Sequence, residues 1–198
     1  MKSGMLTIVW DVDDVLNNLM QSWFENTWLR THPGCNLSYR DIVRNPPGRI
    51  LGISKSEYLE SLDSFRLSKE YSHMKPNESA MCWFFERGRL YRHIALTATP
   101  LKTASISAEW VLGHFGKWIR SFSFVPSSRK GEYSPLYDRT KGDYLSWLGK
   151  GDVLIDDNME NVEAAKKIGL RTVLMPQPWN NSRQTQAECF GSLLESGM

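Results

Sequence analysis

The sequence of 198 residues predicts an α/β fold in which helices flank a parallel sheet and a helical segment is inserted after the first strand. Two short apolar runs, residues 7–10 and 152–155, each lead into neighbouring carboxylates, at the position where open α/β sheets place their ligand sites. From residue 91 onward, strand-like and helix-like segments alternate, as they do in parallel sheets. Between the first two strands, about 75 residues have the pattern of helix and loop, which is too long for a plain crossover and indicates an insertion.

The first half of the chain therefore consists of one buried strand, residues 7–10, followed by expected helices. Apolar residues recur at helical spacing and predict an amphipathic helix over residues 17–31: Leu19, Met20, Trp23, Phe24 and Trp28. Residues 36–54 are rich in Pro, Gly and Arg and are expected to be irregular. Ser54 and Glu57 match a capping box that opens a helix through Leu62, and a further helix is expected from Asn77 to Arg87.

The second half alternates regularly between the two kinds of element. Strands are expected over residues 91–97, 122–125, 152–155 and 172–175, and helices over 103–115, 144–148, 161–168 and, in short form, 187–194. Gly116 and Gly169 follow two of these helices, as glycines that end helices do. The expected organisation is a discontinuous core domain of residues 1–16 and 91–180, a helical cap of residues 17–90 and a C-terminal tail of residues 181–198.

Composition excludes several classes of function. A net charge of +2 is too small to indicate a nucleic-acid groove or a membrane-surface patch, while small anionic substrates remain compatible with it. The apolar or neutral residues before Asp11 are too few for a signal-peptide core or a membrane span, so a cytoplasmic location is expected. The three cysteines lack zinc-ligand spacing and are interpreted as reduced thiols. The oligomeric state is left open, a homodimer included.

The carboxylates after the two apolar runs are the strongest indication of chemistry. Asp11 and Asp13 share one side of an extended chain, and two like charges so close are costly unless a cation neutralises them or one holds a proton. Turn and cap formation is the structural alternative for this segment alone. Asp156 and Asp157 follow a second apolar strand, however, and neighbouring parallel strands would bring all four carboxylates together. Mg²⁺, which prefers oxygen ligands, is the expected occupant.

The order of these features resembles the haloacid dehalogenase (HAD) superfamily of phosphohydrolases across nearly the whole chain. The order runs from Asp11-x-Asp13 after a strand, through Thr97 at the end of the next core strand and a lysine near Lys141, to Asp156-Asp157. Within that superfamily, the chain is most similar to the 5'(3')-deoxyribonucleotidases, on the segments Asp11-Val12-Asp13-Asp14-Val15-Leu16, Glu109 to Gly116, and Leu154-Ile155-Asp156-Asp157. The resemblance implies a Rossmann-like core with a small α-helical cap.

The resemblance also implies roles for individual residues. Asp11 would be the nucleophile that forms an aspartyl-phosphate, and Asp13 would act as the general acid and base. Magnesium would be held by Asp11, by the backbone carbonyl of Asp13 and by Asp156 or Asp157. Phosphate oxygens would be held by Thr97 with Ala98 and Thr99 nearby, and by Lys141.

Several choices stay open at this level. Lys141 is favoured as the phosphate-binding lysine because it precedes a helix, whereas Lys150 lies in a turn between glycines and Lys130 is less suitable still. Thr97-Ala98-Thr99-Pro100 aligns with the family's Thr-Ser-Pro in two ways, so either threonine could be the ligand. Asp14 stands where these nucleotidases have glycine, which makes the turn less free and the site more negative. Asn17 and Asn18 also depart from the family pattern.

The function expected from the resemblance is magnesium-dependent hydrolysis of a phosphomonoester, with a nucleoside monophosphate as the leading substrate. The alternatives are a phosphatase for another small phosphate ester and a non-catalytic phosphate-binding or regulatory protein of the same fold. Trp23, Phe24 and Trp28 could stack on a base, but their helical spacing favours packing. Scattered arginines could bind a second anionic group, although a solvated surface is the more usual role: Arg44, Arg49, Arg87 and Arg89.

Overall fold

The computed structural model describes residues 4–195, with side chains up to residue 192, and contains one five-stranded parallel sheet. Residues 1–3 and 196–198, at the ends of the expected core and tail, lie outside the described part. The strands are β1 (Thr7–Trp10), β2 (Arg92–Thr99), β3 (Phe122–Pro126), β4 (Val153–Asp156) and β5 (Arg171–Leu174), in the order β3-β2-β1-β4-β5. Every neighbouring pair is parallel, which confirms the expected α/β class.

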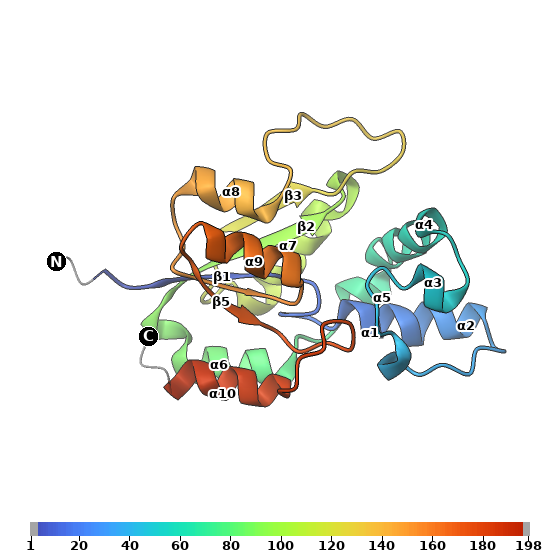
Figure 1. The fold of residues 1–198 in the computed structure, drawn as a ribbon, viewed down its shortest axis with the longest axis horizontal. Helices are drawn as coiled ribbons and strands as arrows, with labels where there is room; N and C mark the ends of the chain where they lie inside the picture. Colours follow the sequence, from blue (N-terminus) through green and yellow to red (C-terminus); the bar gives the residue numbers. More distant parts are fainter. Residues whose placement is uncertain (1–3, 196–198) are drawn as a thin grey trace.

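Alternation along the strands sends apolar side chains to both faces of the sheet. Val9 packs with Leu96 and Leu154 on one face, whereas Ile8 and Trp10 belong to the larger core on the other. Helices α8 (Lys141–Leu148) and α9 (Met159–Lys167) cover the first face, and α7 (Leu101–Phe115) covers the second, as the ribbon shows (Figure 1). The layered arrangement is the Rossmann-like core that the sequence predicts.

Trp10 is the centre of the larger core. Its ring centroid lies 4.7 Å from that of Phe84 and 5.2 Å from that of Trp83, and both belong to α6 (Glu78–Arg87). Its indole N–H donates to Nδ1 of His93 at 3.0 Å, while Nε2 of His93 lies 2.7 Å from the carbonyl of Gly88. Burial lowers the pKa of His93, so a neutral imidazole links these two groups.

Helices α6 and α10 (Gln186–Glu195) pack together beneath the sheet (Figure 1). Helix α6 therefore lies against the core, although it falls within residues 17–90, the range expected for the cap. Trp83 and Phe84 of α6 contact Trp10 of β1. The sequence pattern around α6 does not indicate this contact, because Trp10 is distant in the sequence. Helix α10 lies within residues 181–198, the range expected for the tail, and it packs against the core. The ring of Phe190 stacks on that of Trp10, with centroids 6.2 Å apart.

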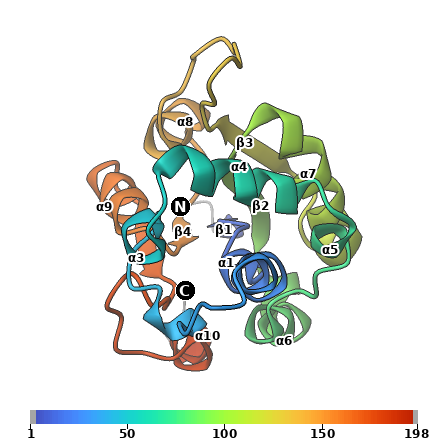
Figure 2. The same cartoon turned by 90° about the vertical axis from the view of Figure 1, so that its right-hand side faces the viewer.

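Apart from a 3-10 turn at Gly88–Leu90 after α6, the remaining helices form a separate layer beyond the carboxyl ends of the strands (Figures 1 and 2), which we call the helical insertion, residues 19–72. It comprises α1 (Leu19–Trp23), a π-helical segment (Phe24–Trp28), α2 (Leu29–Thr31), a short 3-10 turn (Tyr39–Asp41), α3 (Gly48–Leu51), α4 (Lys55–Arg66) and α5 (Lys69–Ser72). The expected packing role of Trp23, Phe24 and Trp28 is supported, because all three are buried.

Helix α4 begins as predicted and ends later than predicted. Ser54 and Glu57 form the reciprocal capping box, with Glu57 N donating to Ser54 Oγ at 3.2 Å and Ser54 N donating to Glu57 Oε2 at 2.8 Å. The helix continues past Leu62 to Arg66 because Asp63 and Arg66, which interrupt the apolar pattern, find buried ionic partners in the core. Among the helices of residues 4–195, none has the length and apolar character needed to cross a membrane.

Candidate active site

A cavity of about 680 Å³ lies between the carboxyl edge of the sheet and the helical insertion. It opens where β1 is flanked by β2 on one side and by β4 on the other, the switch point at which open α/β sheets bind ligands. Most of the site residues expected from the sequence line it: Asp11, Asp13, Thr97, Ala98, Lys141 and Asp157. Asp156 is fully buried behind this surface, and Thr99 does not line the cavity.

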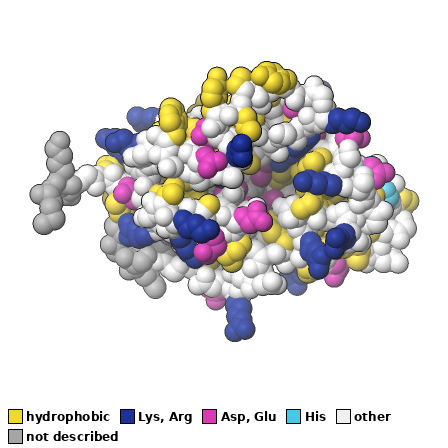
Figure 3. Space-filling view, turned by 45° about the horizontal axis from the view of Figure 1, so that its top comes forward, with side chains coloured by type: hydrophobic (Ala, Val, Ile, Leu, Met, Phe, Trp, Pro, Cys, Tyr) yellow, Lys and Arg dark blue, Asp and Glu magenta, His cyan; other side chains and the backbone are white. Residues whose placement is uncertain are grey.

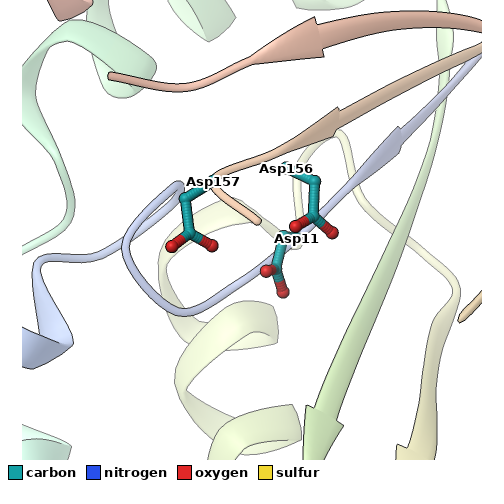
Figure 4. Close-up of side chains that lie close together, drawn as sticks. All are labelled: Asp11, Asp156 and Asp157. Atoms are coloured by element: carbon teal, nitrogen blue, oxygen red, sulfur yellow. The ribbon is translucent and has the colours of Figure 1, made fainter. Parts of the chain in front are cut away.

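The carboxylates of Asp11, Asp156 and Asp157 converge, with one oxygen of each within 4.8 Å of the others (Figure 4). Asp11 directly follows β1, Asp156 ends β4 and Asp157 comes next. The two strands are adjacent and in register, with Trp10 opposite Ile155, so the carboxylates emerge side by side. Distant parts of the sequence are therefore joined at one point by strand pairing.

Lys141 is the cation of this cluster. Its Nζ lies 2.7 Å from Oδ1 of Asp11 and 2.7 Å from Oδ2 of Asp156. Lys141 is the first residue of α8, which begins with a capping box: Thr140 Oγ1 accepts from Asp143 N at 3.1 Å, and Asp143 accepts from Thr140 N. The cap sets the direction of the first helical turn and points the lysine at both strands. Lys150 and Lys130, the sequence alternatives, are exposed and do not line the cavity.

The two neighbouring aspartates have different surroundings. Both oxygens of Asp156 are engaged, because they accept from Lys141, from the backbone N–H of Asn158 and from the side chain of Asn161 at 3.0 and 3.1 Å. Asp157 accepts one side-chain bond, from Nε1 of Trp179 to Oδ2 at 2.8 Å. Asp156 thus positions Lys141, while Asp157 keeps coordinating capacity toward the cavity.

Burial dominates the electrostatics of the cluster. It raises the pKa of Asp11 well above the usual range, opposed by Lys141 and reinforced by the charges of Asp156 and Asp157. Burial also raises the pKa of Asp157, and the charge of Asp156 adds to that effect. For Lys141, burial acts to lower the pKa, but the charges of Asp11 and Asp156 outweigh it and hold the pKa above its ordinary value. When all three carboxyl groups are ionised, the cluster carries more negative charge than one lysine can balance.

This imbalance predicts how stability depends on pH and metal. In the metal-free protein, the raised carboxyl pKa values mean that the folded state binds more protons than the unfolded chain, so these groups stabilise less as pH rises above about 4. A cation that replaces those protons should raise the melting temperature more near pH 8 than near pH 5.5. At a hundredfold excess over its Kd, the expected gain is about 3 kcal/mol.

Differential scanning fluorimetry with magnesium or with a chelator measures this gain at both pH values. The matched variant is Asp157→Asn, which removes one of the three converging carboxylates and should reduce the gain at the higher pH. A gain that is independent of pH, or one that the variant leaves intact, would rule out a cation bound by these carboxylates.

The turn after Asp13 explains how a non-glycine residue fits the motif. Asp14 adopts φ +62°, a left-handed conformation that favours glycine. Its carboxylate accepts from Met20 N at 2.9 Å, its own N–H donates to Asn17 Oδ1 at 3.1 Å, and its carbonyl accepts from Gln177 Nε2 at 2.6 Å. Asn17, which departs from the family pattern, therefore supports the turn that Asp14 requires. Asp14 also lines the cavity and adds a further carboxyl group to it. Burial raises the pKa of this group.

The two threonines at the end of β2 have different surroundings. Thr97 is buried and lines the cavity together with Ala98. Thr99 shares a hydrogen bond of 2.8 Å with the hydroxyl of Thr103 in the first turn of α7. The alternation of the strand puts both hydroxyls on one side of the sheet, but only Thr97 reaches the cavity.

Three ion pairs connect the helical insertion to the core beside this cavity, and sequence reasoning missed all of them; one joins Lys102 Nζ to Oδ2 of Asp63 at 3.3 Å. Arg66 Nη2 lies 2.8 Å from Oδ2 of Asp13, and both side chains are nearly buried. One turn earlier on α4, Asp63 accepts from Nε and Nη2 of Arg129 at 2.7 and 2.9 Å. The signal for Arg66 was present, since Tyr58, Leu62 and Arg66 follow at intervals of four residues and place a cation on the buried face of the helix.

Solved structures with a similar arrangement of helices and strands show that the chain has a haloacid dehalogenase-like fold. No protein-family model matches the sequence, and no curated protein matches it by sequence. A haloacid dehalogenase-like hydrolase from Streptococcus pneumoniae superposes with a TM-score of 0.61 at 15% identity, covering 94% of this chain and 90% of the other. A candidate beta-phosphoglucomutase from Thermotoga maritima gives 0.60 at 20% identity, with coverage of 97% and 100%. A HAD-hydrolase from Bacillus subtilis solved with magnesium gives 0.54 at 11% identity, with coverage of 86% of each chain.

Proposed function

We propose that this protein is a magnesium-dependent phosphomonoester hydrolase that acts through an aspartyl-phosphate on Asp11. The observation that carries the proposal is the buried lysine bridge: Lys141 contacts Asp11 and Asp156 at 2.7 Å each, at the carboxyl ends of neighbouring parallel strands. A fixed cation beside a buried carboxylate is what an attack on an anionic phosphate requires, since it offsets the repulsion between nucleophile and substrate. The helical insertion over the cavity would act as the cap.

The donors present fit Mg²⁺. The converging groups are carboxylate oxygens, the ligands that this hard cation prefers. Asp11 accepts from Lys141 and from Val12 N through Oδ1, and Asp157 accepts from Trp179 through Oδ2, so each has a second oxygen for coordination. We infer that Asp11 and Asp157 supply the carboxylate ligands, with the backbone carbonyl of Asp13 as a further one. Bound magnesium would supply charge stabilisation to the transferring phosphoryl group.

The chain's own groups then have distinct tasks. Asp11 attacks phosphorus, which divides hydrolysis into two easier steps. Thr97 and the backbone N–H groups near Ala98 hold phosphate oxygens together with Lys141, while Thr99 supports the start of α7 from behind. Asp13 donates a proton to the leaving oxygen and later accepts one from the water that hydrolyses the intermediate. Arg66 holds the carboxylate of Asp13 in place, since its guanidinium contacts Oδ2.

The leading substrate class is a nucleoside monophosphate. The similarity to 5'(3')-deoxyribonucleotidases supports it, and so does Trp179, an aromatic side chain at the cavity wall. The aromatic residues of the insertion that could have stacked on a base do not line the cavity: Trp23, Phe24 and Trp28. Met20, Tyr58 and Leu59 line it instead. Another small phosphate ester is the rival, supported by the fold similarity to a candidate beta-phosphoglucomutase.

Release of inorganic phosphate from a panel of nucleoside monophosphates and sugar phosphates tests the proposal, with magnesium and with a chelator. We expect turnover of at least one ester in magnesium and its loss in the chelator. Turnover that survives the chelator would overturn the role of the metal. If no ester is hydrolysed but nucleotides bind, the protein is the non-catalytic phosphate-binding alternative.

A further inference from the structure

A second cavity, of about 520 Å³, adjoins the candidate active site. The two cavities share wall residues from the helical insertion and from the segment after β5: Asn45, Pro46, Lys55 and Trp179. The two cavities therefore border each other at these shared residues. We call this second cavity the basic groove, for the side chains described next.

The charge of the basic groove is entirely positive. Its charged wall residues are Arg44, Arg49 and Lys55, and no Asp or Glu is among its lining. Among the side chains that the structure describes, residues 4–192, none of these three cations lies within 4.0 Å of a carboxylate, although other cations of the insertion and core are paired. In Figure 3, acidic side chains lie in a hollow of the surface with basic side chains near its edge. Three like charges without a counter-ion around one groove indicate an anionic ligand.

We propose that the basic groove binds a second phosphate group of the substrate, so that the preferred substrate is a small bisphosphate. The proposal rests on the proposed hydrolysis at Asp11 and names the substrate class of that site. Two guanidinium groups suit a phosphate in particular, because each can donate two parallel hydrogen bonds to its oxygens. Carboxylates in the first cavity receive the metal, and cations in the second receive the distal phosphate, so the two ends of the substrate would be distinguished by charge.

Trp179 lies between the two cavities and lines both of them. Its Nε1 donates to Oδ2 of Asp157 at 2.8 Å, and its ring lies edge-on to Tyr39 with centroids 6.3 Å apart. These contacts hold the indole between the carboxylate cluster and the basic groove. The part of the substrate that joins the two phosphates would pass this ring, and a planar base could stack on it.

The test compares substrates that differ by one phosphate: adenosine 5'-monophosphate with adenosine 3',5'-bisphosphate, and glucose 6-phosphate with glucose 1,6-bisphosphate. The wild type should hydrolyse at least one bisphosphate with a KM roughly tenfold or more below that of its monophosphate. In the double variant Arg44→Gln/Arg49→Gln this advantage should disappear, while kcat and KM for the monophosphate stay unchanged. The matched control is Arg87→Gln/Arg89→Gln, which removes two exposed arginines that line neither cavity.

Titration calorimetry of each pair of compounds, at low and at high salt, provides a readout that does not depend on turnover. The bisphosphate should bind more tightly than the monophosphate, and the difference should shrink with salt and in the groove variant only. Equal KM and equal affinity within both pairs, or an equal loss in the control variant, would overturn the basic groove as a phosphate site. Absence of any hydrolysis would instead overturn the proposed function, and calorimetry on the wild type would then decide the groove by itself.

Discussion

Asp11→Asn is expected to abolish phosphate release, with kcat reduced by about 10⁴-fold or more, because an amide cannot attack phosphorus. The side chain keeps its size and can still accept from Lys141 and from Val12 N, so the fold should persist. The substitution also removes one negative charge from a cluster in which the pKa of Asp11 is raised by burial and by its acidic neighbours. The melting temperature in chelator should therefore be unchanged or higher.

Two measurements separate loss of chemistry from loss of structure in this variant. Steady-state phosphate release gives kcat, and a thermal melt in the same buffer gives stability. Residual turnover within tenfold of the wild type would show that Asp11 is not the nucleophile. Lost activity together with a markedly lower melting temperature would mean that Asp11 matters through folding.

Lys141→Met is the second substitution with a large expected effect, and it should impair both stability and activity. Methionine matches the length of the lysine stem but leaves Asp11 and Asp156 buried without their cation. Breaking a buried ionic pair by removing one partner costs about 3–5 kcal/mol. We expect that loss in the free energy of unfolding measured by denaturant titration, and loss of turnover in whatever protein stays folded.

The control for Lys141 comes from the sequence itself. Lys150 was an alternative for the same role, yet it is exposed and outside the cavity. Lys150→Met should leave the free energy of unfolding within about 0.5 kcal/mol of the wild type and should not change turnover. If the two lysine variants behave alike, the assignment of Lys141 is incorrect. Excess magnesium should recover part of the stability of Lys141→Met, because a cation can replace some of the lost charge.

Local patterns in the sequence were sufficient for the fold class and for the order of the five strands. The strands are short apolar runs, and the capping box at Ser54 marks where α4 begins. Such signals lie within a few residues of each other, so they can be read along the chain. The same holds for the carboxylates: once residues 7–10 and 153–156 are strands of one parallel sheet, Asp11 and Asp156 must lie near its carboxyl edge. The short helices α3 and α5 and the capping box at Thr140 were not predicted, and residues 36–54, which were expected to be irregular, contain α3 and a 3-10 turn.

Contacts between distant residues decided what the patterns left open. Thr97 lines the cavity and Thr99 bonds to Thr103, although both follow the same strand alternation. Helix α6, which falls within the range expected for the cap, packs against the sheet through Trp83 and Phe84. Arg44 and Arg49, which alone are ordinary surface arginines, lie around one groove beside the candidate site.

The sequence by itself determined the class of fold, the motif Asp11-Val12-Asp13 and the carboxylates that accompany it, because each depends on short-range patterns of burial and hydrogen bonding. Only the tertiary structure decided that Lys141 is the buried cation, that Arg66 contacts Asp13 and that a positive groove adjoins the cavity. Electrostatic partners are chosen by distance in space, and that distance is set when the sheet brings its strands together and the helical insertion closes over them.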